Sequence, residues 1–420
     1  MASSSSGDAE TLGPAGESQS LIPGLPDDVA AVILASLPYF HQARLRATCR
    51  SWNAFLAPRR LLPLRRRLRL PPRHLLCLFP EDPSLSPPYL FDPAAAAWAP
   101  LPRLPCSPHL YGLSNFVPVS LGPHLYVLGG SHFDARSYPI GIPTASAAAH
   151  RLDLTAPPSL LAWHRLPDML SPRGSFACTP VPCGDDGGGG IIVAGGGSRH
   201  CMFPSEGSRM SSVEWYDVDS GEWKMGEGLP RYRAGCVGFL VRRGEEEEFW
   251  VMGGYGDYRT VSGVVPADVY YRDAVVLGMR SGKWREVGDM WEEGERRKLG
   301  SVVVVGGEDG QTPGIFMLDR NDILRYDFAL NRWLKESSLR RKVPADKPCG
   351  FIAMNGELYV LTNATHSTDG SDPRRLPKKR LALEIQAYNP DKRKWRFLTS
   401  NTPFHQPIHF KTAVACTIGL

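Results

Sequence analysis

The first stretch with a periodic pattern of hydrophobic residues is LPDDVAAVILASLPYFHQARLRATCRSWNAFL, which begins at Leu25. Pro26 suits the first turn of a helix, where no backbone N–H is needed, and Pro38 ends that helix. Between them runs one apolar stripe with helical spacing, formed by Val29, Val32, Ile33 and Leu37. A second stripe of the same kind follows, formed by Leu45, Cys49, Trp52 and Leu56. The pattern predicts a small bundle of two or three helices.

From His74 onward the hydrophobic positions form short β-type runs in repeating units. Each unit has two β-runs, a variable loop, an aromatic-Asp strand, a short turn and a Trp. These tryptophans are 49 to 65 residues apart, and they are Trp98, Trp163, Trp223, Trp284, Trp333 and Trp395. Four short strands in each repeat of this length are typical of the blades of a kelch-type β-propeller.

Glycine doublets mark the strand ends that we expect at the crowded axis of the propeller, at Gly129-Gly130, Gly195-Gly196 and Gly253-Gly254. The first unit lacks a leading strand, whereas IHFKTAVACTIGL near the C-terminus resembles a leading strand with nothing after it. Pairing the two would complete one blade and remove open sheet edges. We therefore predict a mainly β fold over residues 74–420, a six-bladed propeller whose first blade is closed by the C-terminal strand.

Composition agrees with a β-rich fold in a reducing compartment. The chain has 420 residues, with 42 Gly and 38 Pro, too many for a mainly helical protein. Nine scattered cysteines without a CxxC pair indicate neither a disulfide framework nor a zinc ribbon, which favours the cytoplasm, the nucleus or both. Residues 1–20 read as a disordered tail, and no apolar run is long enough to predict a membrane span.

A basic segment, RRLLPLRRRLRLPPR, carries seven arginines from Arg59 to Arg73. We interpret residues 61–73 as a basic linker between the helical piece and the propeller, because leucines interleave the arginines as on a packed helix face. A nuclear-import or phosphate-binding patch is the alternative. The net charge of +5 is mild and does not by itself argue for nucleic acid, which we do not expect as a partner.

The helical stretch resembles the F-box: an LP-acidic start, a hydrophobic first helix, a Leu-Pro break, then Cys-Arg-x-Trp. With the kelch units behind it, the chain is similar to plant F-box/kelch-repeat proteins, with an F-box over residues 21–60. The resemblance implies the substrate-recognition subunit of a Skp–cullin–F-box (SCF) ubiquitin ligase. The F-box would dock a Skp-type adaptor, and through it a cullin–ring ligase. The implied adaptor-binding residues are Leu25, Pro26, Ile33, Leu37 and Pro38.

A target protein would bind loops on one rim of the propeller, since binding residues are often carried by loops on a rigid scaffold. Arg and Tyr are frequent interface anchors, and several cations around one mouth would favour an acidic or phosphorylated target segment. The opposing interpretation is that each Arg braces its own blade. The candidate target-binding residues are Phe133, Arg136, Tyr138, Arg173, Arg199, Arg209, Arg233, Tyr255, Tyr258, Arg259 and Lys298.

No motif in the chain predicts catalysis. The 11 histidines are dispersed without HxH or HExxH spacing, and GGGGIIVAGGG lacks the helix and Lys of a phosphate cradle. We therefore predict no catalytic residue, no metal site and no cofactor, with ubiquitin transfer left to other subunits of the complex. Two alternatives stay open, because fold does not settle function: a non-degradative scaffold and a metal-dependent enzyme.

Overall fold

The computed structural model describes residues 20–68, 70, 74–80, 82–136, 143–156, 160–182, 189–197, 209–244, 246–261, 265–291, 299–306, 313–367 and 379–419. The chain divides into two compact units, residues 1–71 and 72–420. Within these described ranges, no helix has the length and apolar content needed to cross a membrane.

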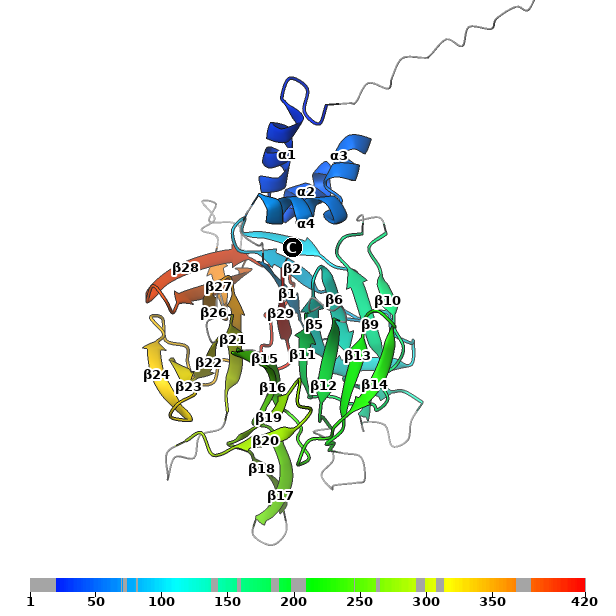
Figure 1. Cartoon of the computed structure of the whole chain (residues 1–420). Helices are drawn as coiled ribbons and strands as arrows, with labels where there is room; N and C mark the ends of the chain where they lie inside the picture. Colours follow the sequence, from blue (N-terminus) through cyan, green and yellow to red (C-terminus); the bar gives the residue numbers. More distant parts are fainter. Residues whose placement is uncertain are drawn as a thin grey trace, which may run out of the picture. The chain divides into compact units, whose positions relative to one another are not determined.

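The first unit is helical, and its elements are α1 (Asp27–Ser36), α2 (Tyr39–Leu45), α3 (Arg50–Phe55) and α4 (Pro58–Arg67) (Figure 1). Two aspartates in the first turn of α1 face the positive end of the helix dipole. The chain is extended at Cys49, whose Sγ accepts a hydrogen bond from Trp52 N at 3.4 Å, so a short break separates α2 from α3.

Helix α4 changes one of the boundaries expected from the sequence. Residues 61–67, predicted as linker, are helical, and Leu61 is buried with Leu34 in the core of the bundle. The buried Arg65 donates a hydrogen bond from Nη1 to the carbonyl oxygen of Ala35 at 2.7 Å. The linker prediction is therefore wrong for these residues, because their leucines complete a core that three short helices leave open.

The described part of the second unit contains six four-stranded antiparallel sheets. The first sheet has the spatial order β29 (Val414–Gly419), β1 (His74–Phe79), β2 (Tyr89–Asp92) and β3 (Ala97–Pro100). The second has the order β5 (Val117–Leu121), β6 (His124–Leu128), β9 (Ala149–Asp153) and β10 (Trp163–Arg165). The third has the order β11 (Ala177–Val181), β12 (Gly190–Ala194), β13 (Val213–Asp217) and β14 (Glu222–Gly226). The fourth sheet has the order β15 (Val237–Arg243), β16 (Glu246–Met252), β19 (Ala274–Gly278) and β20 (Trp284–Val287). The fifth has the order β21 (Ser301–Val305), β22 (Gly314–Asp319), β23 (Asp322–Asp327) and β24 (Arg332–Ser338). The sixth has the order β25 (Gly350–Met354), β26 (Glu357–Ser367), β27 (Lys379–Asn389) and β28 (Lys394–Asn401). This is the predicted six-bladed kelch-type propeller.

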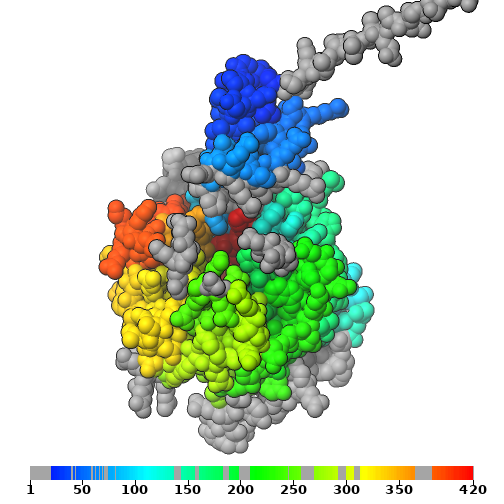
Figure 2. All heavy atoms as spheres, viewed as in Figure 1, coloured from blue at the N-terminus to red at the C-terminus, as the bar shows by residue number. Residues whose placement is uncertain are grey.

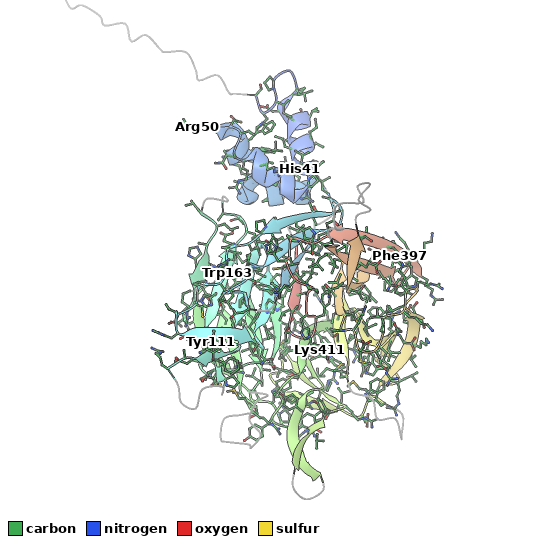
Figure 3. All side chains as sticks on the ribbon, turned by 180° about the vertical axis from the view of Figure 1, so that it is seen from behind. His41, Arg50, Tyr111, Trp163, Phe397 and Lys411 are labelled. Atoms are coloured by element: carbon green, nitrogen blue, oxygen red, sulfur yellow. The ribbon has the colours of Figure 1, made fainter. Side chains whose placement is uncertain are left out.

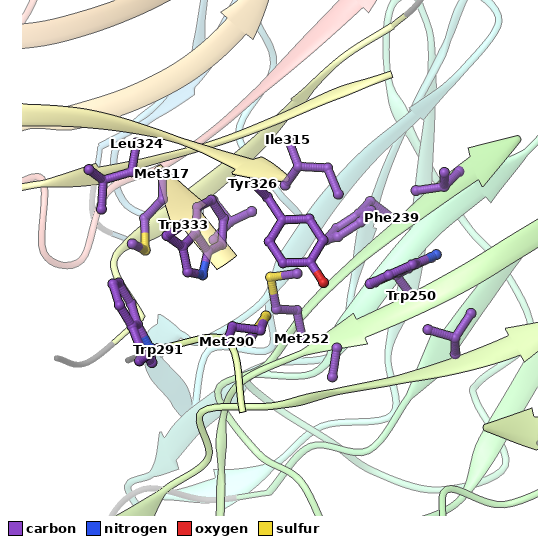
Figure 4. Close-up of a cluster of buried hydrophobic side chains, with 14 residues drawn as sticks. Phe239, Trp250, Met252, Met290, Trp291, Ile315, Met317, Leu324, Tyr326 and Trp333 are labelled. Carbon is purple, nitrogen blue, oxygen red and sulfur yellow. The ribbon is translucent and has the colours of Figure 1, made fainter. Parts of the chain in front are cut away.

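Hydrophobic clusters join the second sheet to the third, the third to the fourth, the fourth to the fifth, the fifth to the sixth and the sixth to the first. In the cluster between the fourth and fifth sheets, Trp250 of β16 packs against Tyr326 of β23, which in turn contacts Trp333 of β24 (Figure 4). A four-stranded blade cannot bury both faces alone, so these contacts between neighbours form the core.

The repeated tryptophans also link neighbouring sheets through hydrogen bonds. The indole Nε1 of Trp163 donates to the carbonyl oxygen of Pro102 at 2.8 Å, just after the last strand of the preceding sheet. Trp223 and Trp284 donate in the same way to residues 167 and 227, each at 3.0 Å. Each of these side chains therefore fills space between two blades and also fixes the register of one blade against its neighbour.

The glycine doublets lie where two backbone segments of the propeller approach each other closely. Gly129 and Gly195 have φ angles of 59° and 66°, in the left-handed region. A Cβ at either position would lie 2.3 Å from the carbonyl oxygen of Arg173 or Arg233, respectively. Only glycine fits both conditions, which accounts for the doublets at these strand ends.

Strands from the two ends of this unit share one sheet. Strand β29 pairs with β1 over six residues, from His74 opposite Gly419 to Phe79 opposite Val414. The hydroxyl of Ser120 in the second sheet donates to the carbonyl oxygen of Thr417 at 2.7 Å. Strand β29 is therefore held from two sides, by its own sheet and by the next one.

Two smaller sheets extend from one side of the propeller. We call this side the loop rim, because it carries the connections from second to third strands and from each sheet to the next. It bears a three-stranded sheet of β4 (Leu110–Ser114), β7 (Ser131–Asp134) and β8 (Thr144–Ala145). It also bears the hairpin of β17 (Tyr255–Val261) and β18 (Val265–Tyr270).

Candidate functional site

Helix α1 carries apolar residues on two faces, of which only one is used by the bundle. Ala30, Leu34 and Ala35 are at most 1% exposed and face the helical core. The other face is exposed by 38 to 43%, and we call it the α1 apolar face: Leu25, Val29, Val32 and Ile33. An apolar stripe that the molecule leaves open is a feature of partner-binding surfaces.

The residues before α1 are fixed to the bundle, which positions Leu25. The backbone N–H of Leu21 donates to Asp27 Oδ1 at 2.9 Å, and the indole of Trp52 donates to the carbonyl oxygen of Leu21. Leu25 N in turn donates to Ile22 O at 3.1 Å. The α1 apolar face therefore begins on a segment held by specific bonds.

The five residues proposed to bind the adaptor fall into two groups. Leu25, Pro26 and Ile33 are exposed. Leu37 and Pro38 are half-buried between α1 and α2, where the Leu37 carbonyl accepts a 2.6 Å bond from Gln42. Sequence reasoning assigned Val29 and Val32 to the apolar stripe but not to the site, although their spacing from Ile33 already placed them on one face.

Arg173, predicted to face a target, is fully buried instead. Its guanidinium pairs with Glu214 of β13 and donates to the carbonyl oxygens of Gly195 and Ser212 at 2.9 and 3.0 Å. Burial lowers the pKa of Arg173, whereas the Glu214 carboxylate raises it. The target-binding prediction is wrong for Arg173, because its guanidinium is fully buried and bonds to the Glu214 carboxylate and to backbone oxygens inside the propeller.

Arg233 repeats this arrangement one sheet further on. It is fully buried, donates to the carbonyl oxygen of Gly253 at 2.8 Å and pairs with Asp273 at 2.8 Å. Its guanidinium also lies over the ring of Tyr271, 4.7 Å from the centroid. The target-binding prediction is therefore also wrong for Arg233. These two arginines brace blades, so they lend no support to a preference for acidic or phosphorylated targets.

Two predicted rim residues remain accessible, on or beside the three-stranded sheet. Phe133 of β7 is half-buried and stacks on Tyr111 of β4 with ring centroids 5.5 Å apart; Tyr111 itself is 42% exposed (Figure 3). Arg136 is exposed and forms a two-point pair with Asp134, with distances of 3.0 and 2.9 Å. These hydrogen bonds hold the pKa of Asp134 at about 2.

Near the β17–β18 hairpin, two of the predicted residues, Tyr255 and Arg209, already contact other groups of the propeller. Tyr255 is only 2% exposed, and the Arg209 guanidinium lies 5.5 Å from its ring centroid while bonding to the carbonyl oxygen of Gly256. The target-binding prediction therefore fails for Tyr255. The backbones of residues 258 and 259 belong to β17, but the side chains of Tyr258 and Arg259 lie outside the described part, as do Tyr138, Arg199 and Lys298.

One accessible aromatic on the loop rim was missed by sequence reasoning. Tyr232 is 59% exposed in the connection between the third and fourth sheets. Its neighbour Arg231 pairs with Asp273 and lies 4.9 Å from the ring centroid of Tyr271. The available signal was the sequence RYR just before a leading strand, where Tyr232 lies next to Arg233, which was chosen as a candidate.

Metal-ligating side chains do not gather in the described ranges. In these ranges, no group of three or more His, Cys, Asp or Glu residues is arranged to hold a metal ion.

Comparison with known proteins agrees with this architecture. The family model for the F-box domain matches residues 22–62. F-box/kelch-repeat protein OR23 of Arabidopsis thaliana is 50% identical over 424 aligned residues, covering 96% of this chain and 92% of the relative. The chain belongs to the F-box/kelch-repeat protein family. F-box/kelch-repeat proteins are in general receptor subunits of SCF-type ubiquitin ligases and not themselves catalytic.

Other F-box/kelch-repeat proteins of Arabidopsis thaliana are more distant. The protein At1g16250 is 26% identical and covers 89% of this chain and 90% of its own length. The protein SKIP30 is 30% identical and covers 53% of this chain and 58% of its own length.

Proposed function

We propose that this chain is a non-catalytic substrate receptor of an SCF-type ubiquitin ligase. The α1 apolar face docks a Skp-type adaptor, and through it the chain joins a cullin–ring ligase. The loop rim of the propeller presents the target protein for ubiquitination. The observation that carries this proposal is the exposure of the α1 apolar face, with Leu25 just before the helix and three apolar side chains on it.

Removal of apolar surface from water would drive this docking. Transfer of apolar surface out of water contributes about 25 cal/mol per Å² buried, so an open stripe of Leu, Val and Ile gains free energy when a partner covers it. The helical bundle already has its own core in Leu34, Leu56 and Leu61. The outer stripe is therefore not required for folding and is available to a groove on a partner.

The test is a binding measurement between the full chain and a purified Skp-type adaptor. The variant is Leu25→Ala/Ile33→Ala, which shortens two exposed side chains and leaves the bundle core intact. The control is Leu330→Ala on the propeller surface, where Leu330 is 61% exposed. We expect the double variant to lose at least tenfold in affinity and the control to bind like the wild type.

Equal binding by the wild type and the double variant, or no binding by either, would contradict the proposal. Far-UV circular dichroism of each variant shows whether the helices are retained.

The target side is tested on the two exposed aromatics of the loop rim. Proteins that copurify with the wild-type chain are compared quantitatively with those that copurify with Tyr111→Ala and Tyr232→Ala. Loss of the same protein from either variant, with the adaptor still present, supports target binding on the loop rim. Identical sets of proteins for all three forms would contradict this part of the proposal.

A further inference from the structure

Two cysteines face each other across the pair of strands that joins the ends of the propeller. In the register of β1 and β29, Cys77 lies directly opposite Cys416. Opposite residues of an antiparallel pair project to the same side of the sheet, with Cα atoms about 4.5 to 5.5 Å apart. Disulfides span Cα separations of about 4.4 to 6.8 Å, so residues opposed in this way lie within the range that a disulfide needs.

The two thiols differ in their access to solvent. Cys77 is fully buried, whereas Cys416 is half-buried on a strand at the inner edge of its sheet. In Figure 2, red atoms from the C-terminal part of the chain are visible at the centre of the face that is shown. Burial and the adjacent Cys416 thiol raise the pKa of the Cys77 thiol. A reagent from solvent therefore reaches Cys416 first.

This pairing is specific to one position. Of the other described cysteines, Cys178 lies opposite Val193 in the ladder of β11 and β12. Cys49, Cys106, Cys236 and Cys349 lie outside the strands. Within the described residues, no second pair of cysteines is opposed across two strands.

We propose that Cys77 and Cys416 are a redox-controlled disulfide site, which joins β1 covalently to β29 when the protein meets a hydroperoxide. In the first step, the Cys416 sulfur attacks one peroxide oxygen, the O–O bond breaks, and a sulfenic acid and water form. In the second step, the Cys77 sulfur attacks the sulfenic sulfur, the S–S bond forms, and the hydroxyl leaves as water with the Cys77 proton. Two thiols lose two electrons, and one hydrogen peroxide becomes two waters.

The disulfide would change the stability of the propeller, since it would close a loop that contains the described strands of all six sheets. Cross-linking residues far apart in sequence removes conformational freedom from the unfolded chain. Strand β29 would then no longer separate from β1 without reduction. This inference does not depend on the adaptor or the target and extends beyond the proposed function.

The experiment uses the full chain, purified in reduced form and treated with hydrogen peroxide. Remaining thiols are alkylated, and the protein is digested and analysed by mass spectrometry without reduction. We expect a linked peptide pair containing Cys77 and Cys416 that disappears after dithiothreitol. Thermal unfolding should show Tm higher by about 5 °C in the oxidised form.

Two variants provide the controls. Cys416→Ser should abolish both the linked peptide and the rise in Tm, whereas Cys349→Ser, at another half-buried cysteine, should retain both. Recovery of Cys77 and Cys416 as separately alkylated or overoxidised residues would overturn the proposal. So would a linked peptide that joins other cysteines, or an equal rise in Tm for Cys416→Ser.

Discussion

The helical unit and the loop rim of the propeller treat their candidate binding residues in opposite ways. The α1 apolar face leaves four apolar side chains open to solvent, although hydrophobic burial is the main driving force of folding. The loop rim places two arginines, Arg173 and Arg233, in the interior, although charged groups lose hydration there. From residue type alone, we would have expected the apolar side chains of α1 to be buried and the two arginines to be exposed.

The difference follows from the groups that each unit has available to fill its own core or to pair with its own charged side chains. The small bundle has enough apolar residues to fill its core and still leaves a stripe over. The propeller has loop carbonyls and a carboxylate close together beside Arg173 and again beside Arg233, and each arginine satisfies several of these groups at once. The accessible residues are therefore those whose groups the fold does not need.

The largest effect that we expect is the loss of a buried arginine. Arg173→Ala leaves the Glu214 carboxylate buried without its partner, which should lower the free energy of unfolding by about 3 to 5 kcal/mol. Urea unfolding measures this change. Arg136→Ala, which removes an exposed pair on the same rim, is the matched control and should destabilise the protein much less, because solvent screens this pair. Equal stability of Arg173→Ala and the wild type would show that this guanidinium does not brace the blades.

A smaller effect separates the two faces of α1. Leu34→Ala removes a side chain that is 1% exposed and should cost about 3 kcal/mol, seen as faster hydrogen exchange in the amides of α1. Val32→Ala, on the same helix but 41% exposed, should leave exchange unchanged and weaken adaptor binding. If both variants accelerated exchange equally, the α1 apolar face would belong to the core.

A buried histidine in the propeller gives a pH test of the same contrast. His150 of β9 is 6% exposed; burial, with the nearby Arg165 adding to it and Asp168 opposing it, lowers its pKa to about 4. The unfolded chain then binds a proton below pH 6.5 that the folded chain does not bind until about pH 4. Stability should fall across this window as pH decreases, by about 2 kcal/mol.

The measurement compares urea midpoints at pH 7 and pH 4.5 for the wild type and for His150→Gln. Part of the pH dependence should disappear in the variant. His41→Gln, at an exposed position in the helical unit (Figure 3), is the control and should keep it. Unchanged pH dependence in His150→Gln would contradict the assignment.

The smallest effect concerns the exposed pair on the loop rim. Asp134 should titrate near pH 2 in the wild type, because Arg136 stabilises its ionised form, and nearer its usual pKa of about 3.9 in Arg136→Ala. Carbon-13 NMR of labelled aspartates measures both midpoints. An unchanged midpoint in the variant would mean that the two-point pair is absent in solution.

The repeated parts of the molecule were predictable, and the non-local contacts were not. Tryptophans and glycine doublets recur because each blade must meet the same packing condition, so Trp223 and Gly195 indicated the propeller directly. Arg173 could not be assigned with confidence, since its partner Glu214 is 41 residues away and nothing local distinguishes a bracing arginine from an exposed one. The sequence left both roles open, and burial decided between them.

The helical unit shows the same limit. The apolar stripe of α1 was visible, but whether Val32 faces the core or solvent depends on α4, which supplies Leu61 to the other face. The leucines among the arginines already suggested a packed helix face, but the segment was interpreted as a linker, and the buried bond from Arg65 to Ala35 has no signature in the sequence.

The indole bonds that run from Trp163, Trp223 and Trp284 to the preceding blade also have a consequence for synthesis on the ribosome. Every acceptor is made before its donor, so each new blade can attach to one that has already emerged, and domains that form in this order avoid waiting with exposed surfaces. The first sheet is the exception, because β1 must wait for β29, more than three hundred residues later. During translation, the edge of β1 therefore stays unpaired, and open to pairing with another chain, until β29 is made.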